Sequence, residues 1–411
     1  MPNEDRKALY FAQITIAGGE EIGLNQMLAF EWKSFVNGGY VIRAKITDPD
    51  LTLLKNPVLK NYLKQARNSP TEVKFKIGYV GGGETKLRTA LLTDLDLYGT
   101  PSHGGFEFVA IDPPNWHLNA GKGDGKVYRG RVSDVIKEVV GEYAPGITAE
   151  VTKTEDDPGC WAMMRQDPKT FIQSLTDWSA NITPSKTNWM IASVDDKIII
   201  KEQKDFLANR THFGDYTASI TNAKRNDIYD FAMLNSNFIT VYQDTLSTQG
   251  ISAVSGKFMD IQTDKEKLKI EDSNTGNKAN ARSDPTKSFK KPEGKWSTSI
   301  ASVPELNGGE LGIKYEDWIA GRARNMFISM LPMIMRVRLT VDGDPTYHDS
   351  SKLGVSTINI NWKDLDGDDV FLSGRWLVYG FHHRMTLVKR PRWWTDVYIY
   401  RIDYDASAKA I

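Results

Sequence analysis

The chain has almost no cysteine and no net charge. Among its 411 residues Cys160 is the single cysteine, so one chain can form neither an internal disulfide nor a multi-cysteine metal site. Lys plus Arg total 52 and Asp plus Glu total 52, which argues against the basic field of a dedicated nucleic-acid binder. Cys160 lies between Gly159 and Trp161, and we predict a buried apolar thiol rather than a nucleophile.

Long apolar stretches are also missing. No apolar run reaches the roughly 18 residues that a membrane-spanning helix needs, so the sequence predicts no such helix. The opening residues 1–7 are charged and lack the apolar core of a signal peptide. We therefore expect synthesis in a cytoplasm without export by such a peptide.

Familiar catalytic motifs are absent as well. The sequence contains no Gly-x-Ser-x-Gly and no His-Glu-x-x-His, and the glycine run 81–83 lacks the Lys-Ser/Thr that completes a phosphate-binding loop. Adjacent acidic residues occur, but neighbours on turns usually carry solvated charge. These pairs are Glu20-Glu21, Asp156-Asp157 and Asp195-Asp196. We predict no catalytic, cofactor-binding or metal-binding residues and no enzymatic activity.

Three further stretches contain residue types that occur in binding sites. The acidic loop Asp364–Asp369 has the oxygen ligands that Ca²⁺ prefers, but it lacks the downstream Glu of a calcium-binding helix-loop-helix, so a turn is favoured. His382 and His383 alternate on an expected strand and should face opposite sides, so they cannot share one metal. The basic cluster Lys389–Arg392 beside Trp393-Trp394 favours a protein interface over a DNA or lipid patch.

Residues 1–114 contain a strand-rich pattern. The runs 27–36 and 40–47 flank Asn37-Gly38-Gly39, which is a hairpin signal, and the run 71–80 alternates apolar and charged residues. Apolar residues at helical spacing predict one helix over Leu51–Arg67. About six strands with one inserted helix predict a β-barrel, which leaves no exposed strand edge.

Residues 115–225 predict a small α/β middle domain. A helical face over 127–143 predicts one helix, with Ser133 or a neighbour as its cap. Asp167-Pro168 opens a second predicted helix, with Asp167 as its cap. Two β-branched runs then flank Asp195-Asp196 and predict a hairpin over residues 188–201.

The remainder predicts a second barrel interrupted by an insertion. Residues 226–246 and 312–411 contain strand-like runs and a helical pattern over Tyr315–Met330, whereas residues 247–311 are polar and predict a loop or arm against a partner. The run around Trp376 is apolar on both faces and predicts a strand covered on both sides. The predicted fold class is therefore α+β, mainly β, with two antiparallel β-barrels, each with a helix, and the middle domain.

Two stretches resemble a known family. The order Gly343-Asp344-Pro345, Ser373-Gly374-x-Trp376-x-Val378-x-Gly380-x-x-His383 and Trp393-x-Thr395 to Arg401 is one, and Gln166 to Trp178 followed by Ile198–Ile200 is the other. Both are similar to the baseplate hub proteins of contractile-tailed bacteriophages, to which the hub region of type VI secretion spike proteins is related. By element order the resemblance covers most of the chain, except the 247–311 insertion.

The resemblance implies two tube-protein-like barrels per chain and a structural role in the virion. Three chains would form a six-barrel ring, a trimeric adaptor that joins the hexameric tail tube to the central spike and lets DNA pass during genome ejection. Its implied partners are two further copies, the tail tube ring, the spike, other baseplate proteins and passing DNA without specific binding. It implies a place in the tail baseplate after synthesis in the bacterial host cytoplasm, and no cofactor.

Two alternatives stay open from the sequence. One is a tail-associated cell-wall hydrolase with an unrecognised carboxylate pair. The other is a carbohydrate-binding adhesin, which the 11 Trp and 16 Tyr residues suggest. We also expect the terminal regions, near 1–112 and 313–405, to superpose on each other.

Overall fold

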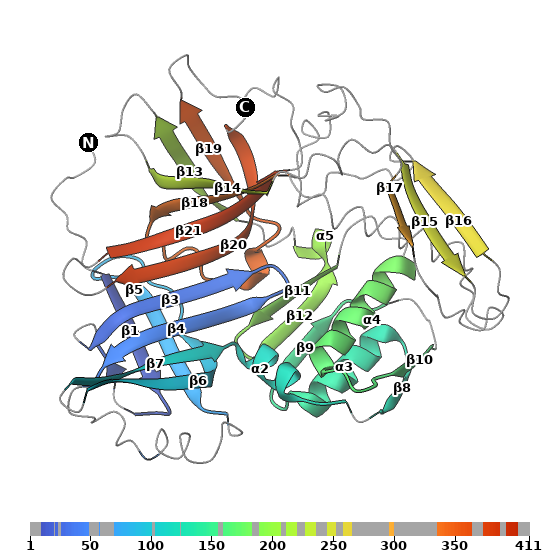
Figure 1. Cartoon of the computed structure of the whole chain (residues 1–411), viewed down its shortest axis with the longest axis horizontal. Coiled ribbons are helices and arrows are strands. Elements are labelled where there is room, and N and C mark those ends of the chain that lie inside the picture. Colours follow the sequence, from blue (N-terminus) through green and yellow to red (C-terminus); the bar gives the residue numbers. More distant parts are fainter. Residues whose placement is uncertain are drawn as a thin grey trace.

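The computed structural model describes the chain in several ranges. These are residues 10–19, 21–23, 26–48, 57, 70–100, 103–123, 125–154, 159–182, 189–206, 211–219, 227–235, 245–251, 258–264, 296–299, 335–363, 373–386 and 392–401. Apart from Pro57, the predicted helix Leu51–Arg67 lies outside the described residues, as do the predicted helix Tyr315–Met330 and the acidic loop Asp364–Asp369. Strands dominate the described chain, as the mainly β prediction states (Figure 1).

The first half of the molecule holds seven strands: β1 (Tyr10–Ile16), β2 (Glu21–Ile22), β3 (Met27–Phe35), β4 (Gly39–Thr47), β5 (Glu72–Tyr79), β6 (Arg88–Thr100) and β7 (His103–Ile111). The expected hairpin forms, with β3 and β4 joined at Asn37-Gly38-Gly39. Both Asn37 and Gly39 adopt positive φ. Gly39 is required there, because a Cβ would lie 2.2 Å from the Asp112 carboxylate. The strands follow the order β3-β4-β7-β6-β5-β1-β2.

The second half contains β13 (His212–Ser219), β14 (Ile228–Asn235), β18 (Met335–Asp342), β19 (Thr357–Lys363), β20 (Gly374–Thr386) and β21 (Arg392–Arg401). Neighbouring strands run β14-β18-β21-β20, and β19 links β20 to β13. β13 lies within the range predicted for the middle domain, yet it pairs in parallel with β19 of this half.

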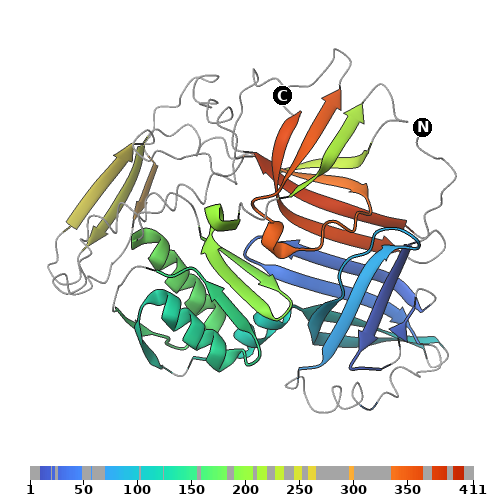
Figure 2. The ribbon, with the colours of Figure 1, turned by 180° about the vertical axis from the view of Figure 1, so that it is seen from behind.

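The two halves form one continuous sheet of 13 strands. Its junction is the antiparallel pair β20–β3. Buried side chains from both halves belong to one hydrophobic core, in which Trp32 contacts the rings of Phe75 and Phe381 at 5.0 and 5.5 Å. The sequence pattern predicts two separate barrels, and the fusion into one sheet corrects that prediction. Seen from behind, the blue strands of the first half continue directly into the red strands of the second (Figure 2).

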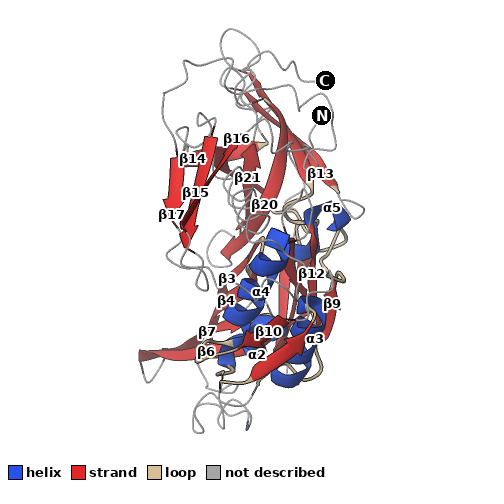
Figure 3. Ribbon diagram, turned by 90° about the vertical axis from the view of Figure 1, so that its right-hand side faces the viewer, coloured by secondary structure: helices blue, strands red, loops and turns tan. Residues whose placement is uncertain are grey.

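The middle region is the helical part of the molecule. It contains α2 (Pro113–Ala120), β8 (Val127–Gly130), α3 (Val132–Tyr143), β9 (Thr148–Val151), β10 (Gly159–Ala162), α4 (Pro168–Ile182), β11 (Trp189–Val194), β12 (Lys197–Glu202) and α5 (Gln203–Phe206). Figure 3 shows the helices gathered here while strands extend through the rest. The helices pack on the sheet β11-β12-β9 around a separate core.

Several local predictions for this region are confirmed and others are corrected. Asp167 caps α4 by accepting a hydrogen bond from the Thr170 backbone N–H at 2.8 Å, and β11–β12 is the expected hairpin. The predicted helix over 127–143 begins only at Val132, because residues 127–130 form β8. Its N-cap is Arg131 with no capping side-chain bond, while the Ser133 backbone N–H bonds to Thr154 instead.

Cys160 is exposed, contrary to the prediction of a buried thiol. It lies in the two-stranded ribbon β10–β8, where alternation gives neighbouring residues opposite faces. Trp161 takes the inward face, packs against the middle core and donates its indole N–H to the Gly130 carbonyl. The thiol is therefore left on the solvent side.

Part of the predicted 247–311 loop or arm forms strands. A three-stranded sheet is formed by β15 (Thr245–Ile251), β16 (Phe258–Asp264) and β17 (Trp296–Ser299). Figure 1 shows it set apart from the 13-stranded sheet, beyond α4. Among the described helices, none is both long and apolar enough to cross a membrane.

Candidate functional site at the junction of the two halves

β20 is the strand that holds the two halves together. Its first residues pair with β19, from Gly374 opposite Ile360 to Leu377 opposite Thr357. Its later residues pair with β3, from Gly380 opposite Phe35 to Thr386 opposite Ala29. Trp376, Leu377 and Val378 are all buried, which confirms the prediction of a strand covered on both faces. One 13-residue strand therefore belongs to both halves.

His383 lies on the core side of this strand and is fully buried. Its Nε2 lies 2.6 Å from the Tyr347 carbonyl and so carries the proton, which leaves Nδ1 as an acceptor. The Trp393 indole N–H and the Thr395 hydroxyl both donate to that Nδ1, at 3.2 and 3.0 Å. Burial lowers the pKa of His383 to about 3, so the imidazole is neutral near pH 7.

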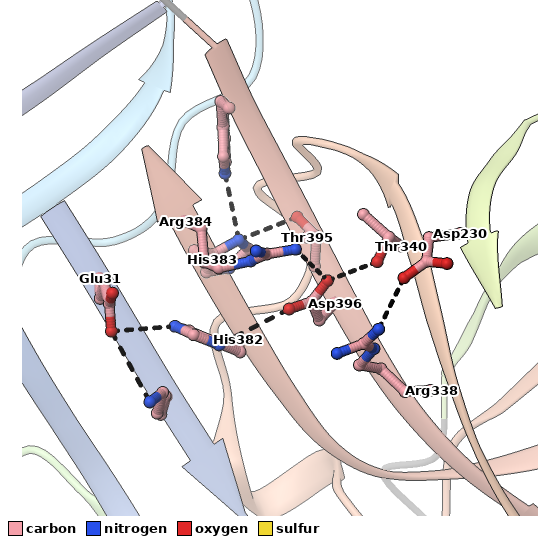
Figure 4. Close-up of polar contacts among 11 residues, drawn as sticks. Glu31, Asp230, Arg338, Thr340, His382, His383, Arg384, Thr395 and Asp396 are labelled. Carbon is pink, nitrogen blue, oxygen red and sulfur yellow. Dashed lines mark hydrogen bonds and ion pairs between the residues drawn. The ribbon is translucent and has the colours of Figure 1, made fainter. Parts of the chain in front are cut away.

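His382 lies on the opposite face, as the alternation predicts. Its Nε2 is 3.3 Å from Glu31 Oε2 and its Nδ1 is 3.6 Å from Asp396 Oδ2 (Figure 4). Burial and the Lys33 ammonium lower the pKa of His382 to about 4, and the two carboxylates oppose that shift. The lowering prevails because burial is the largest of these effects.

A row of charged side chains extends from His382 in both directions. Toward the second half, Arg384 donates to Asp396 at 2.8 Å and Arg338 donates to Asp230 at 2.6 Å (Figure 4). Toward the first half, Lys33 lies 3.6 Å from Glu31, and Arg43 lies 3.2 Å from Glu107. We call this set the charge row: Glu107, Arg43, Glu31, Lys33, His382, Arg384, Asp396, Arg338 and Asp230.

The strand register places the charge row on one face. Glu31 is opposite Arg43 on one side and Arg384 on the other, and His382 is opposite Asp396. The row thus crosses seven strands from β7 to β14, on the side away from the core. Most of its members are open to solvent, whereas His382 and Asp396 are buried. Asp396 also accepts a hydrogen bond from the Thr340 hydroxyl.

The chemistry of the row is that of paired charges rather than of a metal centre. Each of its four carboxylates has a cationic partner within 4 Å, and the two histidines face opposite sides of the strand. Within the described ranges no group of three or more His, Cys, Asp or Glu side chains is placed to hold a metal ion. The row was not found from the sequence, because its members are scattered from residue 31 to residue 396.

Of the basic cluster Lys389–Arg392, only Arg392 lies in the described part of the chain. Its guanidinium lies 5.7 Å from the Trp394 ring, and that of Arg384 lies 5.9 Å from the same ring. Trp394 is thus flanked by two cations next to the charge row, a grouping that interfaces favour.

A separate hollow of about 490 Å³ lies between the first half and the middle region. Its polar lining includes Glu72, His117, Asp195 and Asp196, and the last two form one of the acidic pairs of the sequence. Asp195 already pairs with the buried Arg88 at 2.6 Å, and burial lowers the pKa of His117. Asp195 therefore helps to hold two regions of the chain together.

Comparisons with known proteins identify the fold. The tail protein from Neisseria meningitidis MC58 is similar over 97% of this chain and 98% of its own, at 11% identity and a TM-score of 0.58. The 43 kDa tail protein of prophage MuSo2 from Shewanella oneidensis is similar over 96% and 99%, at 11% identity and a TM-score of 0.56. The chain has the fold of phage tail proteins.

The same fold extends to a secretion system. The E. coli c3393 protein, a type VI secretion component described as structurally similar to the T4 tail proteins gp27 and gp5, matches over 94% of this chain and 76% of its own. Its identity is 9% and its TM-score 0.50. No family model matches the sequence. No curated protein matches it either. The predicted resemblance to tail hubs and secretion spikes is therefore confirmed as a likeness of fold.

Proposed function

We propose that the protein is the baseplate hub of a contractile phage tail, a structural and non-enzymatic part of the virion. The observation that carries this proposal is the end-to-end likeness to phage tail proteins, over 97% of this chain and 98% of the first of them. A likeness over the whole length means that both β halves and the middle region follow one another in the same order in the two proteins. This favours the same architectural role over a likeness limited to a single barrel.

In this role three copies form a ring, and each copy contributes two β halves. Three chains with two halves each give six similar units, which match the hexameric tail tube, while the threefold symmetry matches a trimeric central spike. The fusion of both halves into one sheet supports this arrangement, since it fixes the spacing of the two units within each copy. The ring would enclose part of the channel for DNA during genome ejection.

The mass of the purified protein in solution tests the proposal. Each chain has a mass of 46.2 kDa, so light scattering coupled to size-exclusion chromatography should report three times that mass. Electron microscopy of the particle should then show threefold symmetry. A monomer at every micromolar concentration, together with a tail baseplate from which the protein is absent, would contradict the proposal.

A further inference from the structure

The two-stranded ribbon of β10 and β8 lies at the margin of the middle region, beyond α3 and on the side away from the 13-stranded sheet (Figure 1). One of its faces covers the middle core, where Tyr128 is buried and Trp161 packs against the core residues. Within the described chain, β10 pairs with no strand except β8. The other face of the ribbon and the outer edge of β10 are therefore available to a partner.

The outward face of the ribbon carries a strip of apolar side chains. Alternation places Cys160, Ala162 and Met164 on the same side of the chain. In the ribbon register Cys160 is opposite Arg129 and Ala162 is opposite Val127, and all five side chains are exposed. Val127 is 52% and Met164 66% exposed. Apolar side chains that are exposed together on one face, beside a charged residue, are typical of an interaction surface. We call Val127, Cys160, Ala162 and Met164 the apolar strip.

The outer edge of β10 has free backbone groups. The Met163 N–H donates to the Lys126 carbonyl at 2.9 Å, so the odd-numbered residues of β10 are those that bond across the ribbon. The N–H and C=O groups of Cys160 and Ala162 consequently point away from β8, and no other described strand pairs with them. A free edge beside exposed apolar side chains is a surface on which an extended segment can add as a further strand.

Two arginines define the charge that such a segment must carry. Arg129 lies at one end of the apolar strip and Arg165 follows its other end, and both are exposed. Among the described residues, neither guanidinium forms an ion pair, whereas Lys126 of the same ribbon pairs with Glu142 at 2.6 Å. Carboxylates are the groups that match the fork of a guanidinium. The charges therefore favour an acidic partner.

We propose that the ribbon is a docking site for an extended segment of another tail protein. The segment adds as a strand to the edge of β10, with apolar side chains on the apolar strip and carboxylates opposite Arg129 and Arg165. The same edge of two copies could pair only about a twofold axis, which a threefold ring lacks, and pairing would bring two Arg129 side chains together. This inference rests on the proposed hub function and names a surface through which the hub holds a neighbour.

Cys160 reports whether the apolar strip is covered, because it is the only cysteine of the chain and belongs to the strip. Free protein and purified particles are treated with fluorescein maleimide, and the labelled fraction is read by mass spectrometry after denaturation. Labelling should be complete in the free protein and about tenfold lower in the particle, because the reaction needs an accessible thiolate. Equal labelling in both would overturn the docking site. Protection already in the free protein would assign the strip to a second copy and overturn the choice of partner.

Two variants test the charge and the edge separately. Arg129→Glu reverses one charge, and Ala162→Pro removes an edge N–H that β8 does not use. Each should restore labelling of Cys160 in the particle or keep a folded protein out of the particle. Lys137→Glu, a charge reversal at an exposed position of α3, should behave as the parent. Protection of Cys160 that survives both variants would overturn the proposed contacts.

Melting curves and light scattering establish that each variant is folded and has the mass of the parent. Arg129→Glu changes only an exposed side chain, so it keeps the test decisive if Ala162→Pro does not fold. A protein that stays monomeric and is absent from the tail would contradict the hub function itself. That outcome is read from the mass and from the composition of the particle, before any labelling.

Discussion

At the scale of single residues, the two junction histidines connect pH to stability. The pKa of His383 is about 3 and that of His382 about 4 in the folded chain, both below the ordinary 6.5, chiefly because of burial. Below pH 6.5 the unfolded chain therefore binds protons that the folded chain does not. Stability is complete above that pH and is lost as the pH falls toward the folded values.

This predicts that the free energy of unfolding decreases between pH 6 and pH 4.5 by about 1.4 kcal/mol per pH unit for each histidine. Urea unfolding at several pH values measures the slope. His383→Gln should flatten the slope by about that amount, because Gln cannot take up the proton. An undiminished slope in both His383→Gln and His382→Gln would show that other groups carry the pH dependence.

At the scale of secondary-structure elements, the junction depends on close contact between β20 and β3. Position 380 of β20 has room only for glycine. A Cβ there would lie 2.2 Å from the Phe35 ring and 3.0 Å from the Ser34 carbonyl. The Phe35 ring is itself held 4.9 Å from that of Tyr398. A larger residue must therefore push the two strands apart.

We expect Gly380→Ala to destabilise the protein by about 1–3 kcal/mol, the usual cost of overpacking. Urea unfolding checks the magnitude, and hydrogen exchange should show the loss of protection concentrated in β3 and β20. Gly141→Ala is the control, since a Cβ at this α3 position has no atom within 4 Å and Ala favours a helix. Unfolding of Gly380→Ala at the same urea concentration as the parent would refute the steric argument.

At the scale of the whole molecule, Arg88 ties three regions together. It lies at the start of β6 in the first half and is almost fully buried. Its Nη1 donates to Asp195, in the β11–β12 turn of the middle region, at 2.6 Å. Its Nη2 donates to the His348 carbonyl of the second half at 3.0 Å. The planar guanidinium of Arg88 makes both contacts at once with two of its nitrogens. A lysine has a single ammonium nitrogen and cannot reproduce this geometry.

Arg88→Ala should lower the free energy of unfolding by about 1.5–3 kcal/mol, the range for hydrogen bonds to a charged group. Arg88→Lys should lose less of the free energy of unfolding than Arg88→Ala, because lysine keeps the positive charge. It should still be less stable than the parent, because it lacks the two guanidinium nitrogens that contact Asp195 and His348. Arg43→Ala is the exposed-arginine control and should change stability by less than about 1 kcal/mol. Calorimetry should also show the middle region of Arg88→Ala unfolding at a lower temperature than the rest. A single transition at the temperature of the parent would contradict the role of Arg88 in joining the three regions.

The local pattern of the chain was well determined by the sequence. Alternation and turn residues gave the β3–β4 hairpin, the β11–β12 hairpin and the long runs of β20 and β21, because these signals depend on neighbours in the chain. Asp167 was found as a helix cap for the same reason. The opposite faces of His382 and His383 followed from the twofold alternation of a strand, which holds whatever the strand pairs with.

The tertiary structure decided what no local pattern contains. The pairing of β20 with β3 joins residues about 350 positions apart, so neither the shared core nor the charge row is visible along the chain. The neighbours Gly159 and Trp161 predict a buried thiol for Cys160, but Cys160 is exposed. The orientation of the two-stranded ribbon decides which of two alternating residues faces solvent. Side-chain chemistry and chain spacing fix the elements, whereas the burial of each charge depends on which distant strand supplies its partner.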